Sequence, residues 1–240
     1  MLSCCLLQVG VWAGPPFVTD DPEPVDLHHW EVYLSSMGTR EAGTANGTLP
    51  HVEINNGVAP NLQLHVIFPY AFQQAPGMGT VRGYGDTEVG MKYRMIQEGP
   101  SSPMAGVFPL LEVPTGNAEE DLGSGHLRLF LPLWLQKSWG PWTTYGGGGY
   151  GINPGGGNRN NWLLGWEVQK DLSRRWTLGG ELFYSTPATT SAGDQLNANV
   201  GGQYNFNDDH HLLFSIGRSL HGDIANMYYL GHQWTFGKGN

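Results

Sequence analysis

Charged side chains recur at alternate positions of one stretch in the first half of the chain. The charged positions are Asp86, Glu88, Lys92 and Arg94. Side chains two residues apart in an extended strand lie on the same face. The other face of this stretch carries apolar, aromatic and threonine side chains. Four ionic groups on one face are suited to ion pairing, or to lining a passage whose electric field selects among solutes.

Three further ionic residues fall on the polar parity of their own stretches. They are Arg128, Glu167 and Glu181. In a membrane barrel such groups must point inward, because Lys or Arg facing the middle of the bilayer costs about 2–4 kcal/mol. We therefore expect all of these residues to line the interior and to set the field and selectivity of a pore. Unpaired ions in a narrow lumen are unfavourable, so we also expect salt bridges between strands.

Other motifs that could carry chemistry are weak. The glycine-rich runs near residue 150 are followed by no helix that would present amides to a phosphate. The pairs His28-His29 and His210-His211 place one ring on each face of a strand, so no metal site is expected. His232 has no serine partner close in sequence, which argues against a lipid hydrolase. We predict no catalytic residue, no metal ion and no cofactor.

The elements that position the ionic residues are strands with one polar and one apolar face. For example, Trp162, Leu164, Trp166 and Val168 share one face, and Glu167 lies on the other. Similar stretches are predicted at 28–37, 50–58, 62–72, 84–97, 103–113, 126–137, 141–151, 161–170, 175–186, 194–206, 210–219 and 223–236. Most supply the roughly 9–11 residues that a tilted strand needs to cross a bilayer.

The connections alternate between short and long. Short turns are expected at 59–61, 138–140, 172–174 and 207–209, and longer loops at 38–49, 73–83, 114–125, 152–160 and 187–193. The short connection at 220–222 is an exception on the long side. This arrangement is typical of outer-membrane proteins. The predicted fold class is therefore all-β, a closed antiparallel transmembrane β-barrel of about 12 strands with short periplasmic turns and longer extracellular loops.

Aromatic residues gather near the strand ends on the apolar face. The predicted lipid-facing girdle consists of Trp162, Trp176, Tyr184, Trp234 and Phe236. Tryptophan and tyrosine are enriched where a membrane meets water, so these residues predict the two edges of the apolar band.

Composition supports a barrel and excludes several classes of function. Charged residues make up 14% of the 240 residues, and glycine occurs 36 times. Beyond the N-terminus no apolar run of about 18 residues occurs, so a membrane-spanning helix is not expected. The net charge of −9 argues against nucleic acid as a partner. Both cysteines lie within the first five residues, which excludes a disulfide framework and a thiolate metal site.

The chain divides into four regions. Residues 1–13 are interpreted as the remnant of a signal peptide, although no basic residue precedes their apolar run. Residues 14–27 are rich in proline and acidic side chains and form an extended segment, which either hangs free or folds into the lumen as a plug. Residues 28–236 form the barrel, and residues 237–240 form a tail.

Four phrases of the sequence carry a family resemblance. They are FVTDDP at 17–22, GDTEVGMKY at 85–93, EVPTG at 112–116 and LQKSWGPW at 135–142. With them the chain resembles the bacterial outer-membrane β-barrel transporter family described as "MetA-pathway of phenol degradation". The resemblance covers the chain after residue 14. It implies a barrel of the Gram-negative outer membrane that passes small compounds, including aromatic or hydrophobic ones.

Together these observations predict an outer-membrane channel for passive uptake or efflux of small molecules. Its expected partners are outer-membrane lipid, lipopolysaccharide and a small-molecule solute. Three alternatives stay open: a non-conducting structural or adhesive barrel, a lipid-modifying barrel enzyme with a serine near His232, and a soluble sandwich. The sandwich would require protein to cover the leucine face from Leu127 to Leu135.

Overall fold

The computed structural model describes residues 15–237. Along each strand, successive side chains point alternately into an enclosed interior and toward the exterior. The strands are β1 (His29–Glu41), β2 (Thr44–Ala59), β3 (Leu62–Gln74), β4 (Val81–Tyr84), β5 (Thr87–Ile96), β6 (Met104–Val107), β7 (Leu110–Val113), β8 (Arg128–Trp139), β9 (Trp142–Ile152), β10 (Asn161–Asp171), β11 (Trp176–Ser185), β12 (Gln195–Asn205), β13 (His210–His221) and β14 (Ala225–Gly237). A short 3-10 helix, η1 (Ala118–Glu120), lies in the loop between β7 and β8. None of the helices in this part of the chain is long and apolar enough to span a membrane.

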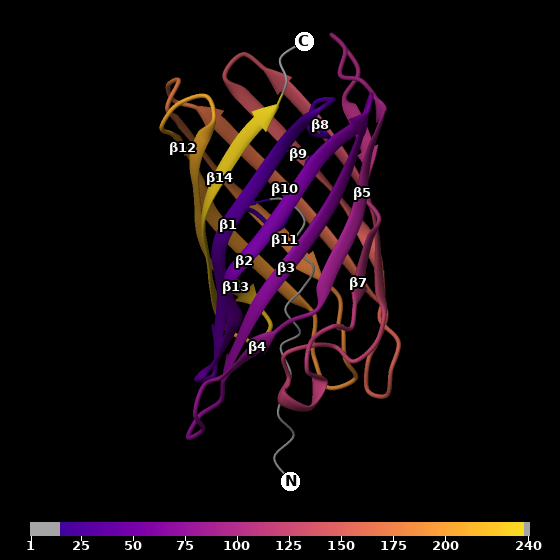
Figure 1. Ribbon diagram of the computed structural model, residues 1–240, viewed down its shortest axis with the longest axis vertical. Coiled ribbons are helices and arrows are strands. Elements are labelled where there is room, and N and C mark those ends of the chain that lie inside the picture. Colours follow the sequence, from indigo (N-terminus) through magenta and orange to yellow (C-terminus); the bar gives the residue numbers. More distant parts are fainter. Residues whose placement is uncertain (1–14, 238–240) are drawn as a thin grey trace.

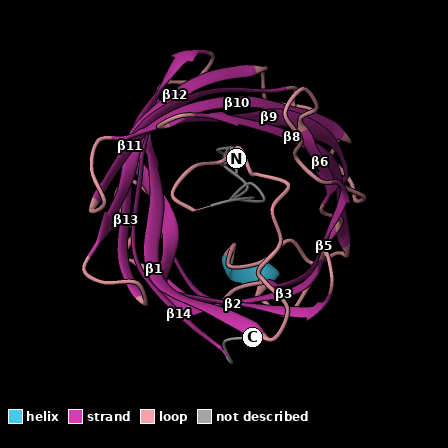
Figure 2. Cartoon of the chain, turned by 90° about the horizontal axis from the view of Figure 1, so that it is seen from above, coloured by secondary structure: helices cyan, strands magenta, loops and turns pink. Residues whose placement is uncertain are grey.

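The sheet closes on itself (Figures 1 and 2). All strand pairs of the wall are antiparallel, and β1 pairs with both β2 and β14. At the seam Trp30 lies opposite Phe236. The segments β4 and β5 form one interrupted barrel strand, as do β6 and β7, so the wall has twelve strands. The predicted closed antiparallel barrel is therefore confirmed.

The two interruptions have local causes. The first lies at Gly85 and Asp86, and the second at Phe108 and Pro109. Proline has no N–H group to donate to the ladder, so it is confined to edges and breaks. The ladder nevertheless resumes on either side, because β3 pairs with both β4 and β5 and β8 pairs with both β6 and β7.

One predicted connection is wrong. A long loop was expected at 38–49, but β1 and β2 continue through this range and meet at a tight turn of Ala42 and Gly43. Both turn residues have positive φ, 46° for Ala42 and 86° for Gly43. Two consecutive positive φ values match the right-handed twist of a hairpin, which makes a two-residue loop sufficient. The small polar residues that suggested a loop instead extend β2, making it the longest strand.

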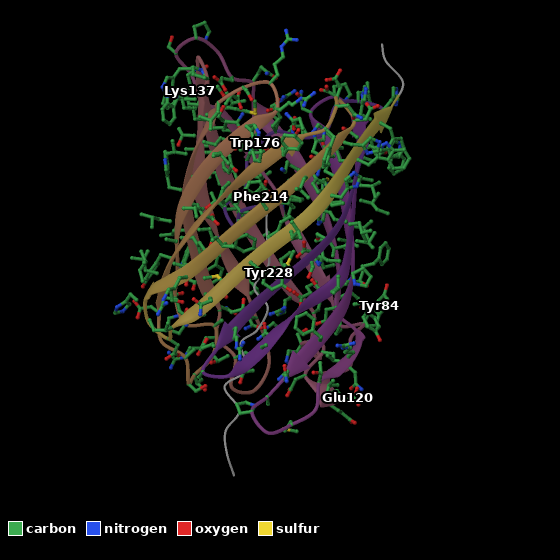
Figure 3. All side chains as sticks on the ribbon, turned by 90° about the vertical axis from the view of Figure 1, so that its left-hand side faces the viewer. Tyr84, Glu120, Lys137, Trp176, Phe214 and Tyr228 are labelled. Atoms are coloured by element: carbon green, nitrogen blue, oxygen red, sulfur yellow. The ribbon has the colours of Figure 1, made fainter. Side chains whose placement is uncertain are left out.

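Side-chain exposure separates the two faces of the wall. On β8, Leu131 and Leu133 are each 47% exposed, whereas the inward Phe130 and Trp134 that flank them are 4% and 0% exposed. Exposed leucine, valine and aromatic side chains continue around the outside of the barrel (Figure 3). An apolar exterior of this extent is unfavourable in water and matches a lipid environment.

The two rims of the barrel differ. The longer loops, including the one with η1, lie at the lower rim in Figure 1. The start of β1, the end of β14 and the short turns after β2, β8, β10 and β12 lie at the upper rim, whereas the short turns after β1 and β13 lie at the lower rim. Outer-membrane barrels place short turns in the periplasm and long loops outside the cell. The upper rim is therefore periplasmic and the lower rim extracellular.

Candidate functional site in the barrel lumen

The predicted ionic residues of the interrupted β4–β5 strand follow the lumen from one rim toward the other. Glu88 and Lys92 are buried inside the wall at 6% exposure each. Arg94 lies nearer the periplasmic rim, where its guanidinium donates to Asn61 Oδ1 at 2.8 and 3.0 Å. Asp86, at the break between β4 and β5, accepts hydrogen bonds from two amides of the loop after β7. The alternation within this strand thus places all four residues on its inner side.

Arg128 on β8 pairs with a carboxylate of the next strand segment. It lies opposite Glu112 of β7 in the ladder, and its Nε donates to Glu112 Oε1 at 2.8 Å. Its Nη2 contacts the same oxygen. Both side chains are largely enclosed, with 14% and 11% exposure. This pair is a salt bridge between strands of the kind expected from the sequence.

Glu167 and Glu181 do not follow that expectation. They lie directly opposite each other on β10 and β11, and neither forms a salt bridge among the described residues. Glu181 accepts from the backbone N–H groups of Val18 and Thr19 at 2.8 and 2.7 Å, and from Asn199 Nδ2 at 2.6 Å. Glu167 is fully buried, and within the described structure neither of its carboxylate oxygens has a hydrogen-bond partner. These two glutamates form no salt bridge because a backbone segment, and not a cationic side chain, covers this part of the inner wall.

That backbone belongs to residues 15–27, named here the lumen segment. It crosses the interior of the barrel instead of hanging free (Figure 2). At one side, Ser215 Oγ of β13 donates to the Pro16 carbonyl at 2.6 Å. At the other, the Val25 N–H donates to Gln63 Oε1 of β3 at 2.8 Å. The segment therefore bridges walls that are far apart in the sequence.

An ion pair and close backbone contacts hold the middle of the lumen segment. Lys92 Nζ lies 3.0 Å from Asp20 Oδ1, and both side chains are buried. Thr19 lies against β10 at Gly165, where an added Cβ would collide with Thr19 Oγ1. At Gly57 of β2 an added Cβ would collide with the Asp26 carbonyl. Glycine is needed at both positions because the segment touches the wall there.

Glu88 belongs to a buried polar network on β2, β3 and β5, whose other members, His65, Asn55 and Glu53, were not among the predicted site residues. His65 Nδ1 lies 2.6 Å from Asn55 Oδ1, and its Nε2 lies 3.2 Å from Glu88 Oε1. Asn55 Nδ2 donates to Glu53 Oε1 at 2.8 Å. The sequence signal that could have identified these residues is the alternation of β2 and β3, which places their side chains on the inward face. Asn55, Asn56 and Gly57 of β2 are residue types that are depleted in strands, which weakens this signal.

The extracellular half of the lumen contains cavities that are lined by residues of the described part of the chain, and two of them are prominent. The first, of about 290 Å³, is named the polar cavity; its lining includes His51, Asp86, Glu88, Glu112 and Arg128. The second, of about 250 Å³, is named the apolar cavity; its lining includes Val18, Phe130, Leu163, Phe183 and Met227. Arg128 lines both, so the cavities meet at the Arg128–Glu112 pair. Val18 of the lumen segment borders the apolar cavity.

The predicted girdle residues lie on the outside of the wall. Trp176 and Trp234 are 42% and 45% exposed and lie toward the periplasmic rim, with Phe236 at 37%. Trp162 is 51% exposed and lies at the extracellular end of β10. Tyr184 is partly buried, and its hydroxyl donates to Asp194 of the following loop at 3.0 Å. Figure 3 shows Trp176 near the rim that carries Lys137, opposite the rim with Glu120.

The histidines considered above form no metal cluster within residues 15–237, because no three His, Cys, Asp or Glu side chains there are grouped suitably. On the outer wall His232 Nε2 lies 3.2 Å from His210 Nδ1. The two rings stack with centroids 5.2 Å apart. In the described structure His232 therefore contacts a histidine and not a serine hydroxyl.

A sequence comparison identifies the family of this barrel. The family model described as "Putative MetA-pathway of phenol degradation" matches residues 39–231. The chain belongs to this family. The match covers every barrel strand at least in part, from β1 to β14. No match was found among curated proteins.

Solved structures with the same fold include outer-membrane channels and porins. The COG4313 outer membrane channel from Pseudomonas putida F1 aligns with a TM-score of 0.70 at 15% identity, covering 90% of this chain and 98% of that one. The NanC porin aligns with a TM-score of 0.63 at 8% identity, covering 85% and 98%. The KdgM porin in complex with disordered oligogalacturonate aligns with a TM-score of 0.59 at 15% identity, covering 86% and 99%. With its apolar exterior, this family member is a barrel of the bacterial outer membrane.

Proposed function

We propose that the protein is a passive channel for small molecules across the outer membrane. The observation that carries the proposal is a closed barrel whose lumen holds two cavities lined by charged and apolar side chains from most of its strands. The barrels with the same fold, among them the COG4313 channel, support this role. A barrel of about twelve strands is wide enough to enclose a lumen, which side chains and inserted segments then narrow.

The lumen charges would select among ions and solutes. The buried acidic residues of the described lumen are Asp20, Glu53, Glu88, Glu112, Glu167 and Glu181. Lys92 is the buried lysine, and Arg94 and Arg128 are partly buried. Carboxylates therefore outnumber cationic side chains along the path. Rings of carboxylates favour the passage of cations, so the channel is expected to discriminate against anions.

The apolar cavity supports small aromatic or hydrophobic molecules as one class of solute. Its lining contains one charged residue, Arg128, and no carboxylate. Phe130, Phe183 and Met227 supply aromatic and thioether surface. A cavity of about 250 Å³ lies just below the roughly 300–1,000 Å³ of sites for drug-sized ligands, so it suits a small one-ring compound.

A non-conducting barrel is the second candidate, and the lumen segment favours it. The segment crosses the lumen and pairs its Asp20 with Lys92, while Arg128 pairs with Glu112. A lumen that is permanently filled would leave the barrel a structural or adhesive role. The two candidates differ in whether the segment leaves the lumen.

A conductance measurement distinguishes the passive channel from the non-conducting barrel. The purified protein, reconstituted in planar bilayers, is expected to give discrete channel events, and liposomes that contain it are expected to take up small solutes such as phenol or glycerol. Empty liposomes and a heat-denatured sample provide the controls. If neither channel events nor solute uptake exceeds these controls, the channel proposal is wrong and the structural or adhesive role is favoured.

A further inference from the structure

Two arginines on the outer wall flank a single asparagine near the extracellular rim. In the ladder Arg40 of β1 lies opposite Asn226 of β14, and Arg218 of β13 lies opposite the same residue. All three side chains are exposed on the outward parity of their strands. Neighbouring strands lie about 4.8 Å apart, so the two arginine Cα atoms are about 10 Å apart. Both guanidinium groups can therefore reach one anionic group in front of Asn226.

The height of this row matches the headgroup level of the membrane. Tyr228, two residues from Asn226 toward the periplasm, is an exposed aromatic residue on the same face (Figure 3). On β1, the outward face runs from Trp30 to Arg40, which are eleven residues counted inclusively. That length is what a tilted strand uses to cross the apolar band. Arginine is costly at the centre of the band and tolerated at its edge, which places the row at the edge.

The charge of the outer wall is complementary to an anion. Within residues 15–237, neither Arg40 nor Arg218 forms a salt bridge. The acidic residues of the strands, among them Glu41 beside Arg40, all fall on the inward parity. On another part of the wall Arg82 is likewise exposed, two residues beyond the exposed Tyr84. The outward cations of the extracellular rim thus lack any anionic partner on the outward faces of the strands.

We propose that Arg40, Asn226 and Arg218 bind a phosphate group of the lipopolysaccharide that forms the outer leaflet. Guanidinium groups and phosphate form strong, charge-assisted hydrogen bonds. Asn226 supplies an amide donor between them. Ile216, which lies two residues from Arg218 toward the periplasm and is 66% exposed, offers apolar surface to the acyl chains of the same lipid. A soluble anion would make no contact with that apolar surface, so we assign the site to a lipid.

The test compares lipid binding to the full-length protein in detergent. The probes are bisphosphorylated lipid A, the same lipid A without its phosphates, and inorganic phosphate. Binding is measured by native mass spectrometry and by the shift in melting temperature. The double variant R40Q/R218Q is compared with R174Q/R175Q, which loses the same charge in a periplasmic turn. Retarded migration of the unheated protein on gels verifies that each variant is folded.

The wild type and R174Q/R175Q should bind bisphosphorylated lipid A at least roughly tenfold more tightly than R40Q/R218Q does, since each charged hydrogen bond lost is worth about that factor. The preference for the phosphorylated lipid should disappear in R40Q/R218Q. Equal binding by all three proteins would overturn the proposal. So would equal binding of both lipids by the wild type, or binding of inorganic phosphate as tight as that of lipid A.

Discussion

Two glutamates that face each other across neighbouring strands have opposite surroundings, so their neutral variants should shift stability in opposite directions. Glu181 accepts two backbone N–H groups of the lumen segment. In Glu181→Gln one amide donor would face these N–H groups, and the barrel should lose about 1–3 kcal/mol. Glu167 is buried with no hydrogen-bond partner among the described residues, so Glu167→Gln removes the cost of burying an unpartnered acidic group and should stabilise the barrel.

Urea unfolding in detergent micelles, followed by tryptophan fluorescence, measures both free energies of unfolding. Each variant serves as the control for the other, because the two substitutions are chemically identical and lie side by side. Destabilisation of similar size in both variants would contradict the assigned surroundings.

Lys92 is expected to hold the lumen segment by its charge. It forms a buried ion pair with Asp20, so Lys92→Met leaves that carboxylate without its cation. Loss of one partner of a buried pair costs about 3–5 kcal/mol, which should favour release of the segment. A cysteine introduced at Thr19 reports the release through faster labelling by a water-soluble maleimide, in a background with Cys4 and Cys5 replaced by serine. Lys137→Met, which breaks a partly exposed pair with Glu98, should leave the labelling rate unchanged.

At the scale of an element, the lumen segment depends on the absence of a side chain from β10. A bulkier residue at Gly165 collides with Thr19, so Gly165→Leu should displace the segment and raise single-channel conductance. Gly180→Leu on the outward face of β11 is the matched control and should leave conductance unchanged. Equal conductance of Gly165→Leu and wild type, with both barrels folded, would mean that the segment does not limit passage.

The periplasmic turn between β5 and β6 depends on one carboxylate. Burial alone would raise the pKa of Glu98, but the Ser138 N–H at 3.0 Å and the Lys137 ammonium at 3.0 Å outweigh it and lower the pKa below its ordinary 4.5. A lowered pKa means that the stabilisation is fully present above pH 4.5 and is lost as the pH falls through the folded value. The protection of the Ser138 amide against hydrogen exchange, relative to its intrinsic exchange rate at each pH, should therefore decrease as Glu98 becomes protonated. In Glu98→Gln this pH dependence should be absent.

For the molecule as a whole, the excess of carboxylates in the lumen predicts cation selectivity. In a salt gradient of potassium chloride across a bilayer, the reversal potential should have the sign of potassium permeation. The triple variant E53Q/E88Q/E112Q removes three lumen carboxylates and should move the reversal potential toward zero, whereas E119Q/E120Q in the extracellular loop should not. Anion selectivity of the wild type would contradict the conclusion that carboxylates dominate the electric field of the lumen.

The interior positions of Glu88, Lys92, Arg128, Glu167 and Glu181 could be read from the sequence, because the side-chain period of a strand fixes which face each residue occupies. The partners of these residues could not be read in the same way. Lys92 pairs with Asp20, and Glu181 binds the backbone at Val18 and Thr19. These contacts join residues 72 and 162 or more positions apart, and no local pattern relates them.

By itself the sequence determined the twelve-stranded wall, its polar interior and its apolar exterior, since alternation and strand length act locally along the chain. It also showed that residues 14–27 are neither a helix nor a central strand, because their prolines exclude both. Only the tertiary structure decided that the described part of this segment crosses the lumen, and that Arg40 and Arg218 lie on either side of Asn226 on the outer wall. The physical reason is closure: joining β1 to β14 brings together residues from opposite ends of the chain and creates the one enclosed space into which the segment folds.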